Sequence, residues 1–297
     1  MKDNRRALLL GLCAVLLWST AATAFKLALL ELTVLQLLCV AIWVSALALL
    51  GTLAWQRRLG VLWMSLREAP LFFLGMACLN PLLYYCMVLS AYDRLPAQQA
   101  QTINYTWAIM LALLSMPVLG QRLALRDWGA VAVGYVGVVI IATEGQPFSL
   151  EFTSAGGVAL ALGSTVVWAM FWLLSARSGR DPIISLAAYF VCAALPALVL
   201  CLLWGGGIPS PGSGLLSAVY VGFFEMGFTW LLWSTALRAA TNVSRVGNLI
   251  FLSPMLSLVF IGLILGETIH PATLVGLALI VPGIFLQHRS GSAVQEA

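Results

Sequence analysis

Residues 215–233 read LLSAVYVGFFEMGFTWLLW, an apolar run about long enough to cross a bilayer, with one acidic side chain, Glu225, at its centre. A carboxylate in the middle of a bilayer costs about 3 kcal/mol on insertion scales, so it is tolerated chiefly where it faces a cavity or a partner. Glu225 is therefore the first candidate for a functional residue. The apolar run around it also indicates the class of fold.

The rest of the chain has the same apolar character. Of its 297 residues, 62% are hydrophobic and 9% are charged, against about 25% charged residues in a soluble domain. The mean hydropathy is +1.00. The net charge of +4 is dispersed, without a run of Lys and Arg, so nothing in it indicates nucleic-acid binding. We predict an all-α integral membrane protein whose surroundings are membrane lipid.

Ten transmembrane helices follow from apolar stretches of about 20 residues that are separated by charged residues or by Gly and Pro. Their predicted ranges are 7–29, 33–55, 69–91, 96–119, 126–143, 155–176, 183–204, 214–236, 244–265 and 271–288.

The basic residues predict the orientation, because Lys and Arg accumulate in cytoplasmic loops. With the N-terminus inside, 13 of the 15 basic residues are cytoplasmic, and Lys26 and Arg94 lie outside. Both termini are then cytoplasmic, in a multi-pass protein of the cell (inner or plasma) membrane. The basic N-terminus followed by an apolar run is also typical of a cleavable signal peptide. We favour retention, because cleavage would leave nine helices and destroy the repeat described next.

The chain contains an internal repeat. Three residues recur 144 positions later: Ser90, Arg94 and Asn104 return as Ser234, Arg238 and Asn248. Further along, Gly120-Gln121 matches Gly266-Glu267 at an offset of 146. Five helices in each copy make the second copy enter the membrane from the opposite side, which is the inverted repeat of secondary transporters, with substrate bound near the midplane. The predicted divisions are a first five-helix repeat at 1–143, an extracytoplasmic linker at 144–153, a second repeat at 154–290 and a cytoplasmic tail at 291–297.

Short motifs in both repeats resemble the drug/metabolite transporter superfamily and, within it, the ten-helix EamA branch. The first motif is Trp18-Ser19 followed by Lys26, and the second is Ser253-Pro254, then Leu265-Gly266-Glu267, then Gly276. In the first repeat the chain departs from the family pattern, with Gln121 in place of the usual Glu and Ala108 where a Pro is often found. The resemblance covers the whole chain and implies a transporter.

A narrower likeness concerns residues 102–107, which read TINYTW. They are similar to an Ile-Asn-Tyr-x-Trp stretch in the branch that exports aromatic and other amino acids. The likeness implies an amino-acid-like solute, and export is inferred from it alone.

The candidate site combines Glu225 with polar and aromatic side chains at related depths. Helical spacing places Phe228 beside Glu225, and the 144-residue offset pairs Phe224 with Asn80 and Phe228 with Tyr84. A carboxyl group that is removed from water can hold a proton near neutral pH, where it could exchange that proton for substrate. The alternative is a buried Glu that holds a structural hydrogen bond, and for each aromatic residue the alternative is ordinary packing. The predicted substrate-binding residues are Glu225, Trp18, Asn80, Tyr84, Tyr85, Asn104, Tyr105, Trp107, Trp168, Phe228 and Asn248, with Glu225 also the proton-coupling residue.

The sequence offers little for catalysis. It has no His, Cys and carboxylate cluster with metal-ligand spacing, and no phosphate-binding loop for a nucleotide. We therefore predict no metal, no cofactor and no enzymatic activity. The prediction is a secondary transporter that exports small organic metabolites, amino acids or related amphipathic solutes, across the cytoplasmic membrane by alternating access. It acts with or without proton coupling, as a monomer or homodimer. The alternative is a channel-like or accessory membrane scaffold without coupled transport, which would tolerate Glu225→Gln.

Overall fold

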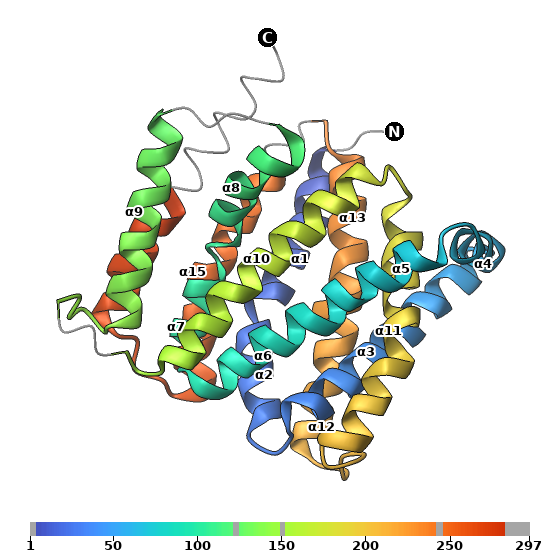
Figure 1. Cartoon of the computed structure of the whole chain (residues 1–297), viewed down its shortest axis with the longest axis horizontal. Coiled ribbons are helices and arrows are strands. Elements are labelled where there is room, and N and C mark those ends of the chain that lie inside the picture. The colour runs from blue at the N-terminus through green and yellow to red at the C-terminus, as the bar shows by residue number, and fades with distance from the viewer. Residues whose placement is uncertain (1–3, 121–124, 149–151, 242–245, 283–297) are drawn as a thin grey trace. The chain divides into compact units, whose positions relative to one another are not determined.

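The computed structural model describes residues 4–120, 125–148, 152–241 and 246–282 (Figure 1). Every regular element in these ranges is helical. The residues fall into two compact units, each with most of its contacts inside itself. The first combines Met1–Cys86 with Gly179–Gly266, and the second combines Met87–Ser178 with Glu267–Ala297. We describe each unit separately.

Both units consist of long apolar helices, some of them interrupted. The elements of the first unit, of which α6 continues along the chain into the second, are α1 (Asn4–Ser19), α2 (Ala21–Leu29), α3 (Val34–Trp55), α4 (Leu59–Glu68), α5 (Pro70–Ala77), η1 (Cys78–Leu83), α6 (Tyr84–Arg94), α11 (Pro182–Trp204), α12 (Ser213–Tyr220), η2 (Val221–Phe228), α13 (Thr229–Ala239), η3 (Asn248–Phe251), α15 (Leu252–Phe260) and η4 (Ile261–Leu265). In the second unit they are α7 (Ala97–Asn104), α8 (Trp107–Leu119), α9 (Leu125–Ala142), α10 (Ala155–Arg177) and an apolar helix at Pro271–Pro282.

Eight helical stretches of the described chain are long and apolar enough to cross a membrane. They are 4–29, 34–55, 70–94, 97–119, 155–177, 182–204, 213–239 and 248–265, within a few residues of eight predicted spans. The predicted spans at 126–143 and 271–288 correspond to shorter apolar helices, Asp127–Ala142 and Pro271–Pro282. The last six residues of the final predicted span lie outside the described residues. The count of ten transmembrane helices stays a prediction.

In the first unit, α3 and α11 lie side by side in opposite directions (Figure 1). At the start of α3, Thr33 Oγ1 donates to Gly205 O at 2.8 Å and Gln36 Nε2 donates to Gly207 O at 3.1 Å. At its far end, Arg58 contacts Asp181 at the start of α11. Thr33 and Gln36 also form a capping box, which fixes where α3 begins. Polar contacts therefore hold this antiparallel pair at both ends.

A glycine allows η2 to approach α3 closely. A Cβ atom on Gly222 would lie 2.5 Å from Ala41 O, so a larger side chain would force the two helices apart. In the second unit, Gly137 in α9 and Gly276 in the 271–282 helix are close in the same way. A Cβ atom on either one would lie 2.7 Å from the carbonyl oxygen of the other. These glycines set the helix spacing in both units.

The structure contains one helix that the sequence analysis did not predict, the ten-residue α4, which joins α3 to α5. Several predicted helices are also interrupted. Asn80 leaves helical geometry at φ −146° and ψ 122° ahead of Pro81, because a proline inside a helix breaks the regular hydrogen-bond ladder. Two interruptions were not predicted, one at Thr20 between α1 and α2 and one at residues 105–106 between α7 and α8.

Candidate functional site

Glu225 lies in η2, a stretch of π-helix within the 213–239 span. Tyr85 Oη, from the first turn of α6, donates to Glu225 Oε1 at 3.0 Å. The second carboxylate oxygen, Oε2, is buried and has no hydrogen-bond partner among the described residues. A buried polar atom without a partner costs free energy, and such groups in native proteins often have a functional reason. One half of this carboxylate is thus anchored, and the other half has no partner in the described chain.

The wider π-helical turn leaves backbone carbonyls that side chains from other helices satisfy. Ser45 Oγ of α3 donates to Gly222 O at 2.5 Å, and Trp18 Nε1 of α1 donates to Glu225 O at 3.4 Å. Single π-helical turns occur often at functional sites. Here the turn places the main chain of Glu225 against α1 and its side chain against α6.

Aromatic rings surround the same turn. The Trp18 ring contacts Trp230 at 5.1 Å and Trp233 at 5.4 Å between ring centroids. Tyr84 and Tyr85 pack edge to face at 4.8 Å. Of the predicted site residues, Trp18 and Tyr85 thus contact Glu225 directly, and Tyr84 lies against Tyr85.

Three other predicted residues of the first unit have different surroundings. Phe228 is exposed and stacks on Phe223 at 6.0 Å. It lines a groove of about 360 Å³ together with residues of α3 that include Ala48 and Thr52. Asn80 is buried with its Oδ1 atom unpaired, and Asn248 begins η3, also with a buried, unpaired Oδ1. Both amides share with Glu225 an acceptor oxygen that the described residues leave unsatisfied.

The remaining predicted residues belong to the second unit. Asn104 Nδ2 donates to Ser164 Oγ of α10 at 2.9 Å. Trp168 is buried one turn further along α10, stacked on Phe171 at 5.6 Å and near Trp172 at 6.0 Å. Tyr105 lies in the interruption between α7 and α8, and Trp107 is the first residue of α8. These residues lie on α7, on α8, on α10 and in the turn between α7 and α8, and α10 packs against both α7 and α8.

A polar network around Gln98 was missed by the sequence analysis. Glu267 accepts from the N–H groups of Ala97 and Gln98 at the start of α7, at 2.9 and 3.3 Å. The Gln98 amide donates to Thr268 O at 3.0 Å and accepts from His270 N at 2.8 Å and Thr273 Oγ1 at 2.9 Å. The signal was present in the sequence, because residues 97–102 read AQQAQT inside a predicted membrane span.

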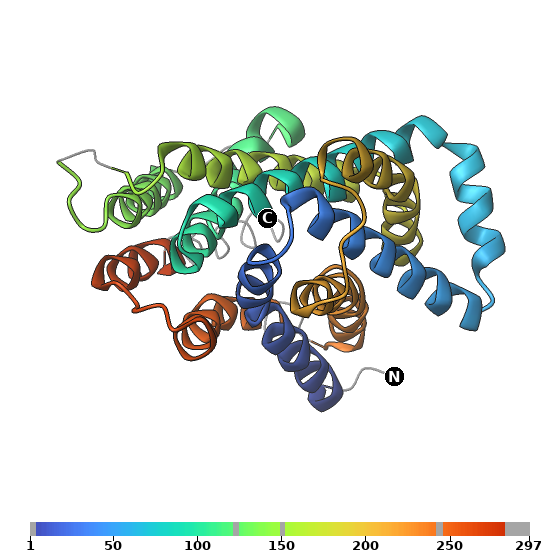
Figure 2. The same ribbon diagram turned by 90° about the horizontal axis from the view of Figure 1, so that it is seen from below.

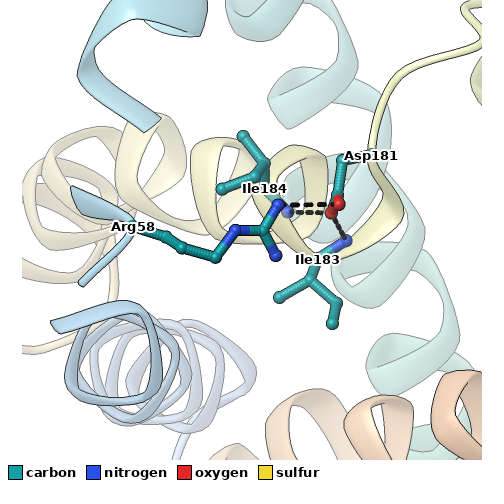
Figure 3. Close-up of polar contacts among 4 residues, drawn as sticks. All are labelled: Arg58, Asp181, Ile183 and Ile184. Carbon is teal, nitrogen blue, oxygen red and sulfur yellow. Dashed lines mark hydrogen bonds and ion pairs between the residues drawn. The ribbon is translucent and has the colours of Figure 1, made fainter. Parts of the chain in front are cut away.

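An ion pair was also missed, because its partners lie 123 positions apart. Arg58 Nη2 lies 2.8 Å from Asp181 Oδ2, and Asp181 Oδ1 accepts from the N–H groups of Ile183 and Ile184 (Figure 3). Burial of the Asp181 carboxyl opposes ionisation. The hydrogen bonds from Arg58 and from the two N–H groups outweigh that effect, so the pKa of Asp181 lies below its ordinary value.

A second carboxylate holds the opposite end of α3. Glu31 accepts hydrogen bonds from Ser213 Oγ and Gly214 N, at the start of α12. The Ser213 hydroxyl and then the Gly214 N–H stabilise the ionised form, which lowers the pKa of Glu31 below its usual range. Acidic side chains therefore cap helix starts at both ends of this unit.

The described residues contain no group of three or more His, Cys, Asp or Glu side chains that could hold a metal ion. What the arrangement offers chemically is a carboxyl group inside an apolar unit, fixed by one phenol and surrounded by aromatic rings. Such a group can accept a proton or bind a cationic amine.

Comparison of the sequence with known families and proteins gives three findings. A model of the EamA-like transporter family matches residues 5–143 and 155–287. The chain is 25% identical, over 93% of its length and 95% of the relative, to a protein named aromatic amino acid exporter from Ancylobacter novellus. It is 27% identical, over 65% of each chain, to a protein named probable terminal-alkyne amino-acid exporter from Streptantibioticus cattleyicolor.

A solved crystal structure of a protein shares the fold. Its TM-score is 0.66 at 23% sequence identity, and the match covers 95% of this chain and 96% of that one. The helical architecture described above is therefore one that an experimental structure also shows.

Proposed function

Since the chain belongs to the EamA-like transporter family, we propose that it is a secondary transporter that exports amino acids or related amphipathic solutes by alternating access, coupled to protons through Glu225. Family membership and the long apolar helices make it a multi-pass membrane transporter. The substrate class, the direction and the coupling are our proposal.

The observation that carries the coupling is the environment of Glu225. One carboxylate oxygen is fixed by Tyr85, and the other is buried without a hydrogen-bond partner in the described chain. A purely structural acid is expected to satisfy both oxygens. An acid that binds a proton and a substrate amine in turn keeps one oxygen unpaired between them, and the opening steps of alternating access would bring each of them to the buried Oε2.

The substrate class is supported by the relatives and by the aromatic side chains. Two similar proteins are named as exporters of amino acids, one of them aromatic. The rings of Trp18, Tyr84 and Tyr85 gather near Glu225, and Trp168 and Phe171 stack in the second unit. Flat apolar walls with a few polar groups suit an organic solute.

We also propose two inverted five-helix repeats, 1–143 and 154–290, joined by an extracytoplasmic linker at 144–153, with both termini cytoplasmic and a cytoplasmic tail at 291–297. Three observations support this topology. The family model matches the chain twice. The helices α3 and α11, which are the second predicted helices of the two repeats, run antiparallel to each other. Gly120 and Gly266, which the repeat pairs, both take a left-handed conformation at a helix end, with φ of 70° and 69°.

The proposal is tested by transport into proteoliposomes with labelled amino acids, with and without an imposed pH gradient. Wild-type protein is expected to show saturable flux that follows the gradient, and Glu225→Gln to lose the gradient-driven part. Glu68→Gln, an exposed acid at the end of α4, is the matched control and should transport normally. Gradient-driven flux that survives Glu225→Gln would contradict the coupling. No flux for any amino acid would favour the scaffold alternative.

A further inference from the structure

The short helix α4 is held at the edge of the first unit by an ion pair at each end. Arg58, which immediately precedes α4, pairs with Asp181 at 2.8 Å. Glu68, its last residue, lies 3.9 Å from Arg180, whose guanidinium sits over the Phe73 ring at 5.3 Å. The helix is thereby fixed against the start of α11, with Leu62 buried beneath it.

The connections of α4 restrict how far it can lie from the bilayer. Residues 56–58 link it to α3, which is itself a candidate membrane span. Ala69 alone links it to α5, which begins the next span. The left-handed backbone of Arg57, at φ 55°, turns the chain sharply at the end of α3. Figure 1 looks nearly along α4, whereas Figure 2 shows it from the side as a bridge between the ends of α3 and α5.

The outer surface of α4 combines apolar and basic side chains. Trp63 is 57% exposed, and Leu59, Val61 and Met64 are also exposed. The Arg67 guanidinium lies 4.8 Å from the Trp63 ring centroid. Arg57 and Arg67 are exposed, and neither forms an ion pair with a described residue. Tryptophan beside arginine on a short amphipathic helix is typical of the bilayer interface.

We propose that α4 lies in the headgroup layer of the membrane and that Arg57 and Arg67 bind anionic phospholipid headgroups, with Trp63 buried among the lipids beside them. Because α4 is joined closely to two membrane spans, we take lipid as the partner of its exposed surface. The two arginines favour lipids with a negatively charged headgroup. Each basic residue near the membrane surface is expected to increase the local concentration of anionic lipid by about fivefold. This proposal does not depend on the transported substrate.

The test uses the full chain in nanodiscs of zwitterionic lipid, with and without about a third of anionic phosphatidylglycerol. Lipid brominated near the carbonyl groups quenches tryptophan at the interface. The signal of Trp63 is obtained as wild type minus Trp63→Phe. Trp204, an exposed tryptophan at the far end of α11, is the matched control, measured through Trp204→Phe.

The expected result is that Trp63 is quenched more strongly, by at least a few fold, when the anionic lipid carries the bromine than when the zwitterionic lipid does. Arg57→Gln with Arg67→Gln should remove that preference, and Trp204 should show none. Arg58 is left unchanged because it pairs with Asp181. Native mass spectrometry of the same variants, with fewer anionic lipids retained by the double variant, provides a second readout that does not need Trp63→Phe to fold.

Two outcomes would overturn the proposal. Equal quenching by both lipids would place α4 at the interface without selecting anionic headgroups. Quenching of Trp63 by aqueous iodide, but by neither lipid, would place α4 in water, as a surface for a soluble protein or a second copy.

Discussion

Gln98 in α7 and Glu225 in η2 are both polar side chains inside apolar spans, but their surroundings differ. The amide of Gln98 makes three hydrogen bonds, to Thr268, His270 and Thr273. The carboxylate of Glu225 receives one, from Tyr85, and its second oxygen is buried without a partner in the described chain. A satisfied network stabilises one packing arrangement. A buried acid with an unpaired oxygen lowers the stability of the fold, so its presence is more readily explained by a function. The comparison is between a polar group with a structural role and the acid that we propose as functional.

The largest effect is expected from Gln98→Leu. The change leaves the Thr268 carbonyl, the His270 N–H and the Thr273 hydroxyl without their partner, which should lower the free energy of unfolding by about 3 kcal/mol. Thermal unfolding in detergent measures it. Gln98→Glu keeps the acceptor oxygen and should lose less. Equal stability of Gln98→Leu and wild type would remove the distinction between the two sites.

Glu225→Gln should have the opposite profile. Gradient-driven flux is expected to fall by about 10- to 100-fold, the range typical of coupling between sites, while the free energy of unfolding changes by less than about 1 kcal/mol. Flux and thermal unfolding of one preparation measure both. A variant that loses stability and flux together would instead make Glu225 a structural residue like Gln98.

Tyr85→Phe sharpens the same comparison by removing the one hydrogen bond that fixes the Glu225 side chain. Loss of a hydrogen bond to a charged group costs about 1.5 kcal/mol, so flux should fall by about tenfold. Tyr135→Phe in α9, whose hydroxyl is buried without a hydrogen-bond partner among the described residues, is the control and should retain flux. If both variants behave alike, the tyrosines act through packing and not through the carboxylate.

The smallest effect concerns Asp181, whose charge is satisfied by Arg58 and two N–H groups. Because its pKa is lowered in the folded protein, its contribution to stability is present above the unfolded pKa of about 3.9 and is lost as the pH falls through the folded pKa. Asp181→Asn keeps the helix cap, since Asn caps as well as Asp. The substitution should lower the free energy of unfolding by less than about 1 kcal/mol at neutral pH, because the ion pair is about a third exposed. Below the folded pKa of Asp181 it should have no effect. Unfolding measured across pH checks this, and a difference that persists at acid pH would contradict it.

Much of the helical framework follows from the sequence, because apolar stretches of bilayer length are a strong signal. The span around Glu225, predicted at 214–236, is observed at Ser213–Ala239. The helix α4 was missed because ten residues with Arg67 and Glu68 at the end are too short for a span. The EamA resemblance, based on a few short motifs, is confirmed by the family match.

The details of the site depend on features that a sequence pattern does not contain. An apolar π-helical turn has the same composition as an α-helical one, so the stacking of Phe228 on Phe223 was not foreseen. The bond from Tyr85 to Glu225 spans 140 positions, and the bond from Trp18 spans 207. Residue types selected Glu225, Trp18 and Tyr85 as candidates, but only tertiary packing decides which atoms meet.

The interleaved make-up of the first unit affects how the protein can be synthesised. The unit combines Met1–Cys86 with Gly179–Gly266, and Arg58 and Asp181 are 123 positions apart. At synthesis rates of about 5–20 residues per second, α3 waits about 6–25 s for α11 after it leaves the ribosome. During that interval its polar end groups need a temporary partner, such as lipid headgroups or an insertion chaperone. A gene split within residues 144–153 would place α3 and α11 on different chains and turn this waiting step into an encounter between them.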